Sequence, residues 1–179
     1  MMQALRNGGL TNVLFDPARE HLNQTFGDDY YQVNPEFLEV GRDNYMNPEF
    51  LASIPDGSLV KVMWEGLYLL PSRDYKVVFM WRDPLEIMSS MFGAFGDRGC
   101  RAFIDQYPSM MNEAIQYCEE RSDIDIHEVH FAEMTNHPHE AFCDLQKEGW
   151  PIDPQIAADS IKPELYRHRA SQILLQAVI

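Results

Sequence analysis

The chain has few basic residues and no long apolar run. Its 179 residues include 14 Lys and Arg against 28 Asp and Glu, which gives a net charge of −14. Nonspecific binding to nucleic acid or to an anionic membrane needs a basic surface. No segment approaches the ~20 consecutive apolar residues that span a bilayer. We therefore expect neither nucleic acid nor a membrane among the partners of this protein.

Cysteine is also scarce. Cys100, Cys118 and Cys143 are odd in number, far apart and without a CxxC pair, which is typical of reduced thiols. The first six residues lack the long apolar core of a signal peptide. These features predict a cytoplasmic protein. No spacing of His and Cys fits a zinc site, so we expect no bound metal.

The composition is that of a folded domain, with 45% hydrophobic and 12% aromatic residues. Length and uniform composition predict a single domain over residues 1–179. Apolar runs predict strands at 11–15, 58–64, 75–81 and 124–131. Helices are expected at 1–7, 17–24, 34–38, 47–51, 65–70, 84–95, 98–121 (with a break near Pro108), 139–148, 154–161 and 170–179. This alternation predicts an α/β fold with a mainly parallel sheet flanked by helices.

The most informative segment runs from Tyr75 to Ser90. An apolar strand ends on Arg82-Asp83-Pro84, and a helical pattern starts at once, with Asp83 suited to cap it. Ser90 follows Arg82 by eight residues, about two helical turns. A fixed guanidinium, a helix N-terminus and a hydroxyl together suit a phosphate dianion. A simpler alternative is a turn in which Arg82 is solvated, or paired with Asp83 or Glu86.

This pattern of strand, Arg-x-Pro and serine resembles the 3′-phosphate-binding motif of sulfotransferases, which use 3′-phosphoadenosine-5′-phosphosulfate (PAPS). Residues 1–9 resemble the helix that follows the phosphosulfate loop in that family, and the likeness extends to about residue 95. It implies a P-loop-type, three-layer architecture, with PAPS as cosubstrate and a small-molecule or glycan acceptor. Arg82 and Ser90 would hold the nucleotide's 3′-phosphate. Arg82 would then lie at the end of a parallel strand, with helix 1–7 opening toward the same cleft.

The chain departs from the family chiefly because it contains no Gly-rich phosphate loop; the family's late Arg-Lys-Gly signature is also missing near Arg167 and Arg169. Two explanations stay open: the true protein starts upstream of Met1, or this is a shortened relative that has lost donor chemistry. We expect the 179-residue form to be a weak catalyst or inactive. We also expect an open sheet edge, covered by a partner strand or in a homo-oligomer.

The remaining site residues rest on the same resemblance. Sulfuryl transfer needs a base for the acceptor's proton, and Glu65 and His21 are the candidates. Arg167 and Arg169 would close over the 3′-phosphate, although cations at a helix C-terminus also have a purely electrostatic explanation. The function implied is transfer of a sulfuryl group from PAPS to a hydroxyl or amine. The alternative is a non-catalytic nucleotide- or protein-binding module with the same fold.

Overall fold

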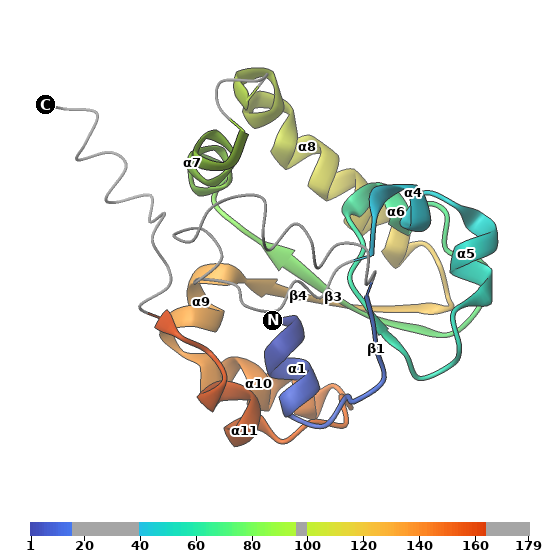
Figure 1. Ribbon diagram of the computed structural model, residues 1–179, viewed down its shortest axis with the longest axis vertical. Coiled ribbons are helices and arrows are strands. Elements are labelled where there is room, and N and C mark those ends of the chain that lie inside the picture. Colours follow the sequence, from blue (N-terminus) through green and yellow to red (C-terminus); the bar gives the residue numbers. More distant parts are fainter. Residues whose placement is uncertain (16–39, 96–99, 164–179) are drawn as a thin grey trace, which may run out of the picture.

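The computed structural model describes residues 1–15, 40–95 and 100–163, and only the backbone of residues 90–95 and 100–104 (Figure 1). The expected helices at 17–24, 34–38 and 170–179 lie outside these ranges. The described elements are α1 (Met2–Asn7), β1 (Val13–Leu14), α4 (Arg42–Tyr45), α5 (Pro48–Ser53), β2 (Leu59–Val60), α6 (Trp64–Leu67), β3 (Tyr75–Trp81), α7 (Pro84–Phe95), α8 (Cys100–Glu119), β4 (Ile124–His130), α9 (Phe131–Asn136), α10 (Pro138–Lys147) and α11 (Pro154–Asp159).

The described strands form two small parallel sheets. Strand β3 pairs with β4 over its whole length, from Tyr75 opposite Ile124 to Trp81 opposite His130. Strands β1 and β2 pair over two residues each, so these two strands are much shorter than the sequence predicts. A strand extends only as far as a neighbour completes its hydrogen bonds, and β1 offers β2 only Val13 and Leu14. The mixed helix and strand content is that of an α/β protein.

Helices cover both faces of the β3–β4 pair. On each face, the helices pack against the strands through one hydrophobic cluster. Val78 and Met80 of β3 contact the first cluster, in which Leu5 of α1 and Phe142 of α10 are buried. Phe79 belongs to the second cluster, which is built mainly by α8. The alternation of side chains along β3 therefore supplies both cores. In Figure 1, α1, α9, α10 and α11 lie on one side of the two strands, and α7 and α8 on the other.

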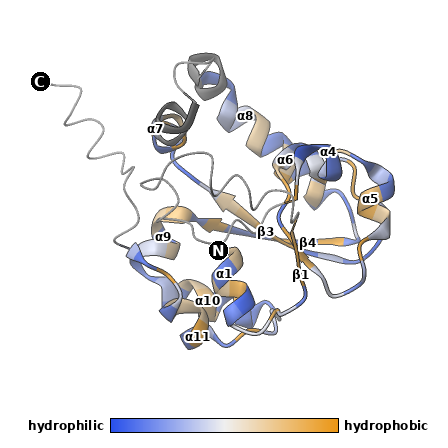
Figure 2. Ribbon diagram, viewed as in Figure 1, coloured by the Kyte–Doolittle hydropathy of each residue, from blue (hydrophilic) through white to orange (hydrophobic). Residues whose placement is uncertain are grey.

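Hydropathy follows this arrangement. Hydrophobic residues gather where the strands cross the centre of the molecule, whereas α4 at the rim is hydrophilic (Figure 2).

The second cluster also holds α8 together across its proline. Tyr107 and Met111, on either side of Pro108, are both buried in it, and α8 is continuous over residues 100–119. The expected break near Pro108 was therefore wrong, because burial on both sides outweighs the one hydrogen bond that proline removes. None of the helices in the described ranges is both long and apolar enough to cross a membrane.

Local signals fix several helix ends as the sequence predicts. The Asp83 carboxylate accepts a hydrogen bond from the Leu85 backbone N–H at 2.8 Å, at the start of α7. Asn47 caps α5 in the same way, through the N–H groups of Glu49 and Phe50. Helix α10 ends before Gly149, whose φ of 81° favours glycine. These caps set the direction in which each helix leaves its strand or loop.

A charged network joins the amino ends of β3 and β4 to the preceding loop. Arg121 donates to both carboxylate oxygens of Asp123, at 2.9 and 2.6 Å. It also donates to the backbone carbonyls of Leu70 at 2.8 Å and Pro71 at 3.0 Å. Asp123 in turn accepts the backbone N–H of Arg73 at 3.0 Å. The turn between α8 and β4 is thus tied to the residues that lead into β3.

A second tie joins the two ends of the described chain. The backbone N–H of Asp153 donates to the Gly8 carbonyl at 2.7 Å, and Asn7 donates to the Ser160 hydroxyl at 2.9 Å. A Cβ atom added to Gly8 would lie 3.1 Å from the Cβ of Ala157. Helices α1 and α11 therefore approach closely, and any larger residue at position 8 would push them apart by a few tenths of an ångström.

Candidate functional site

The carboxyl ends of β3 and β4 carry a cluster of aromatic and charged side chains. Parallel α/β sheets bind their ligands at this edge. The rings of Trp81 and His130 stack there, with centroids 6.4 Å apart and an interplanar angle of 17°. The Trp81 indole N–H donates to the Glu128 carboxylate. These contacts lie at the end of β3 that leads into Arg82.

Arg82 directly follows β3, as the sequence predicts, and its guanidinium group is held on two sides. Its Nε donates to an oxygen of Glu86 at 3.5 Å. Its Cζ lies 4.7 Å from the centroid of the Phe131 ring, at the start of α9. The Arg82 side chain is 26% exposed and that of Glu86 only 6%. Neither Nη nitrogen of Arg82 hydrogen-bonds to any residue of the described ranges. An Nη pair of this kind is a suitable donor set for an oxyanion.

Helix α8 holds the backbone of Arg82. The backbone N–H of Arg82 donates to the Tyr107 hydroxyl oxygen, and Tyr107 is itself buried. Burial raises the pKa of Tyr107, while the hydrogen bond and the charge of Arg82 work in the opposite direction. The tyrosine therefore stays a neutral phenol over the physiological range. The end of β3 is anchored through its backbone as well as through the Arg82 side chain.

Glu65 lies beyond the carboxyl end of β2, in the short helix α6. Its Oε1 is 3.8 Å from an Nη nitrogen of Arg42, whose side chain is largely exposed. Its Oε2 is buried and has no hydrogen-bond partner among the described residues. Burying an unsatisfied oxygen costs about 1–3 kcal/mol.

Of the six candidate residues, Arg82 directly follows β3, whereas Glu65 lies in α6, several residues after the end of β2. Strands β2 and β3 belong to different sheets of the described chain, so the two residues do not share one sheet edge. Ser90 lies in α7, but its side chain is outside the described part of the chain. His21, Arg167 and Arg169 also fall outside the described ranges.

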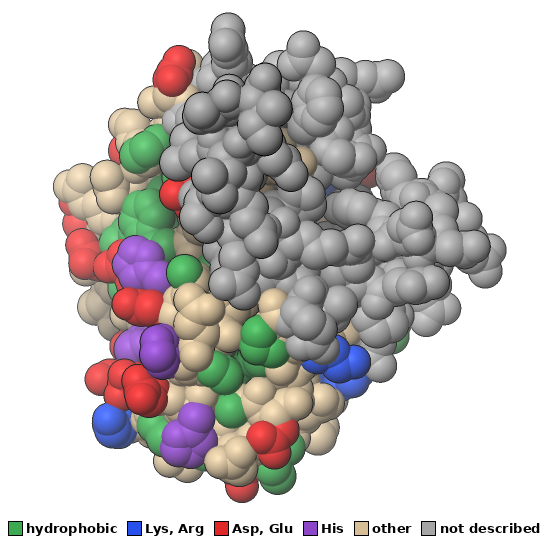
Figure 3. Space-filling view, turned by 90° about the vertical axis from the view of Figure 1, so that its left-hand side faces the viewer, with side chains coloured by type: hydrophobic (Ala, Val, Ile, Leu, Met, Phe, Trp, Pro, Cys, Tyr) green, Lys and Arg blue, Asp and Glu red, His purple; other side chains and the backbone are tan. Residues whose placement is uncertain are grey.

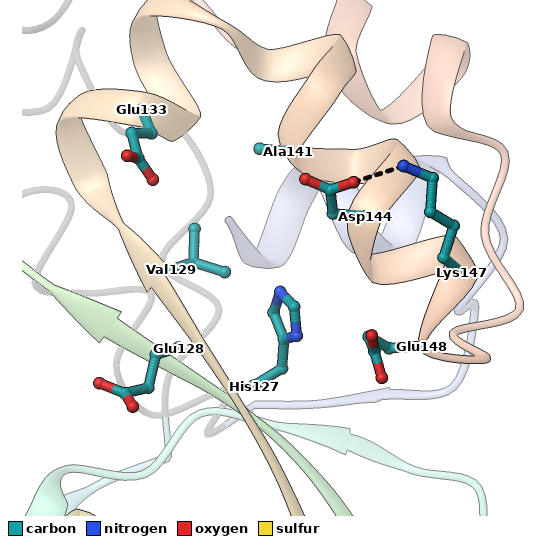
Figure 4. A pocket seen from close by; sticks show the side chains of 8 residues that line it. All are labelled: His127, Glu128, Val129, Glu133, Ala141, Asp144, Lys147 and Glu148. Carbon is teal, nitrogen blue, oxygen red and sulfur yellow. Dashed lines mark hydrogen bonds and ion pairs between the residues drawn. The ribbon is translucent and has the colours of Figure 1, made fainter.

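A separate hollow of about 350 Å³ lies between β4, α9 and α10 (Figure 4). Its walls are mostly polar and carry four carboxylates; they comprise His127, Glu128, Val129, Glu133, Ala141, Asp144, Lys147 and Glu148. Lys147 donates to Asp144 at 2.7 Å, and this hydrogen bond lowers the pKa of Asp144. Figure 3 shows acidic and histidine side chains close together on one face, with few Lys or Arg. An acidic hollow disfavours a phosphate, so the Arg82 end of the sheet is the better anion site.

His127 and His130 point to opposite faces of β4, as side chains three positions apart on a strand do. His127 lines the hollow, whereas His130 stacks on Trp81. In the part of the chain that the structure describes, no group of three or more His, Cys, Asp or Glu residues could hold a metal ion.

Sequence reasoning named Glu86 only as an alternative partner of Arg82, and it missed Phe131 and Tyr107. The i, i+4 spacing of Arg82 and Glu86 is a helical signal visible in the sequence. The role of Phe131 could be found only from the pairing of Trp81 with His130. This pairing places Arg82 and Phe131, the residues that follow the two strands, side by side.

Comparison with known proteins adds no family to these observations. The chain matches no protein-family model, and no curated protein or solved structure is significantly similar to it. The functional assignment therefore rests on the chemistry of the carboxyl edge.

Proposed function

We propose that this chain is a sulfotransferase-like protein with a P-loop-type fold, which binds the 3′-phosphate of PAPS at Arg82. The observation that supports it best is the state of the Arg82 guanidinium at the end of a parallel strand. It is held through Nε and through one face, while both Nη nitrogens lack a described partner. Such a planar pair of donors matches two oxygens of a phosphate. Ser90 would add a hydroxyl donor from α7.

The proposed reaction is an in-line transfer. The bond between the sulfur and the bridging oxygen of PAPS breaks, and the acceptor's hydroxyl or amine forms a new bond to sulfur. The acceptor's proton passes to a base, for which Glu65 and His21 remain the candidates. Of these two, only Glu65 lies in the described part of the chain. Arg167 and Arg169 would close over the 3′-phosphate, and adenosine 3′,5′-bisphosphate would leave.

Titration calorimetry tests the nucleotide site. The chain should prefer adenosine 3′,5′-bisphosphate to AMP, since only the former carries a 3′-phosphate. Arg82→Ala should weaken binding of the bisphosphate by about 2–3 kcal/mol, because a charge-assisted, bidentate contact is lost. The control is Lys147→Ala, which removes an exposed cation from α10 and should change nothing. Equal affinity for the two nucleotides, or no effect of Arg82→Ala, would reject the site.

The second candidate function is a non-catalytic nucleotide- or protein-binding module with the same fold. The buried Glu86 carboxylate favours it, because it offsets the positive charge that Arg82 presents to a substrate. The enzyme and a nucleotide-binding module both predict binding of the bisphosphate, whereas a module that binds only a protein does not. Only the enzyme releases that nucleotide from PAPS in proportion to an added hydroxyl or amine acceptor, so a release assay with a panel of small-molecule and glycan acceptors separates them.

We further propose a cytoplasmic setting and a covered sheet edge, by a partner strand or in a homo-oligomer. Within the described ranges, β2 pairs only with β1, and β3 only with β4. An unpaired edge is a template for another strand. Sedimentation equilibrium over a range of concentrations would test self-association.

A further inference from the structure

We infer that Glu86 is a positioning residue, which holds the Arg82 guanidinium so that the site takes one oxyanion end-on through Nη1 and Nη2. This inference rests on the proposed anion site at Arg82 and adds how that site selects its ligand. The side chain of Glu86 is almost fully buried, yet Glu86 lies in the first turn of α7, beside the candidate site. A carboxylate in that position needs a cationic or hydrogen-bonding partner.

The contacts of Arg82 define which of its donors remain. A guanidinium offers a side-on pair of donors, Nε with one Nη, and an end-on pair, Nη1 with Nη2. Glu86 engages Nε, which leaves the end-on pair for a ligand. Phe131 covers one face of the guanidinium plane at 4.7 Å and limits its rotation. The ligand class that fits is a terminal, doubly charged oxyanion such as a phosphate monoester.

A purely structural role for Glu86 must be separated from this one. Asp83 caps α7, and Glu86 is the third residue after it. A glutamate at that position can complete a capping box by accepting the backbone N–H of the capping residue. Glutamine serves the capping box equally well but carries no charge. Glu86→Gln is therefore the informative substitution, because it preserves the cap and weakens the hold on Arg82.

The first measurement needs no ligand. In ¹⁵N NMR spectra, the Nε–H signal of Arg82, assigned by its loss in Arg82→Lys, should exchange slowly with water in the native chain. Exchange should be at least tenfold faster in Glu86→Gln, at an unchanged unfolding temperature. The control is Glu113→Gln, which removes the charge of an exposed acceptor of a side-chain hydrogen bond on α8 and should leave the Arg82 signal unchanged. Equal exchange rates in Glu86→Gln and the native chain would overturn the inference.

The second measurement uses adenosine 3′,5′-bisphosphate. Glu86→Gln should weaken its binding by about fivefold to tenfold, since an unheld arginine loses rotamer entropy on binding. Arg82→Lys should bind as poorly as Arg82→Ala, because an ammonium cannot present a planar pair of donors. Unchanged or tighter binding by Glu86→Gln would show that Glu86 competes with the ligand, and would overturn the inference. If the native chain binds no bisphosphate, both the proposed function and the end-on binding of an oxyanion are rejected. The exchange rates of the Nε–H then decide alone whether Glu86 holds Arg82.

Discussion

Replacing Arg121 by methionine should destabilise the fold more than any other single loss of charge described above. The side chain is 16% exposed, and it donates to two backbone carbonyls and to both oxygens of Asp123. Methionine keeps much of the aliphatic length but none of these donors. Arg121 and Asp123 are only part-buried, so we expect a cost of about 2–3 kcal/mol, below that of breaking a fully buried ion pair. For a chain of this size, that cost lowers the unfolding temperature by roughly 5–10 °C.

Thermal unfolding followed by circular dichroism would measure this change, and urea unfolding would check that the transition stays cooperative. Lys147→Met is the matched control, because it also removes a cation from a carboxylate, in this case the exposed Asp144. Exposed pairs contribute little to stability, so the control should melt with the native chain. If Arg121→Met also melts with the native chain, the network does not hold the amino ends of β3 and β4 together.

Two further substitutions test the ties described above. The hydrogen bonds from Arg121 lower the pKa of Asp123 from 3.8 to about 2. The ionised carboxylate therefore stabilises the fold above its unfolded pKa. This stabilisation is lost as the pH falls through about 2. Asp123→Asn should therefore flatten the dependence of urea unfolding on pH below 4; an unaltered slope would contradict the pairing. Gly8→Val should destabilise the chain by about 1–3 kcal/mol through overpacking against Ala157, and native-like urea stability would show that α1 and α11 have room to separate.

Elements with strong local signals were predicted from the sequence. The run from Tyr75 to Trp81 is apolar and is followed by a capping aspartate and a proline, and both β3 and α7 form as expected. Helix α9 was missed, because residue His130 before it makes no side-chain cap. That helix depends instead on the burial of Met134 and Thr135, which only the folded chain reveals.

The candidate site likewise has one part that the sequence predicts and another that depends on pairing between segments. The position of Arg82 follows from a pattern within 16 consecutive residues, so the sequence could predict it. Its contact with Phe131 depends on the register between β3 and β4, which joins residues about 50 positions apart. The short pairing of β1 with β2 is likewise a property of two segments together. Sequence patterns describe a single segment well, whereas pairing between segments has to be observed.

The tie between α1 and α11 has a consequence for how the chain folds during synthesis. The Asn7–Ser160 hydrogen bond joins residues 153 positions apart, and the first hydrophobic cluster combines Leu5 with Phe142 and Ala157. Contacts so distant along the chain form slowly, since a long loop must close first. On the ribosome, β3, α7, α8 and β4 can assemble while α11 is still inside the exit tunnel. Until α11 emerges, Leu5 lacks part of the cluster that buries it in the folded chain.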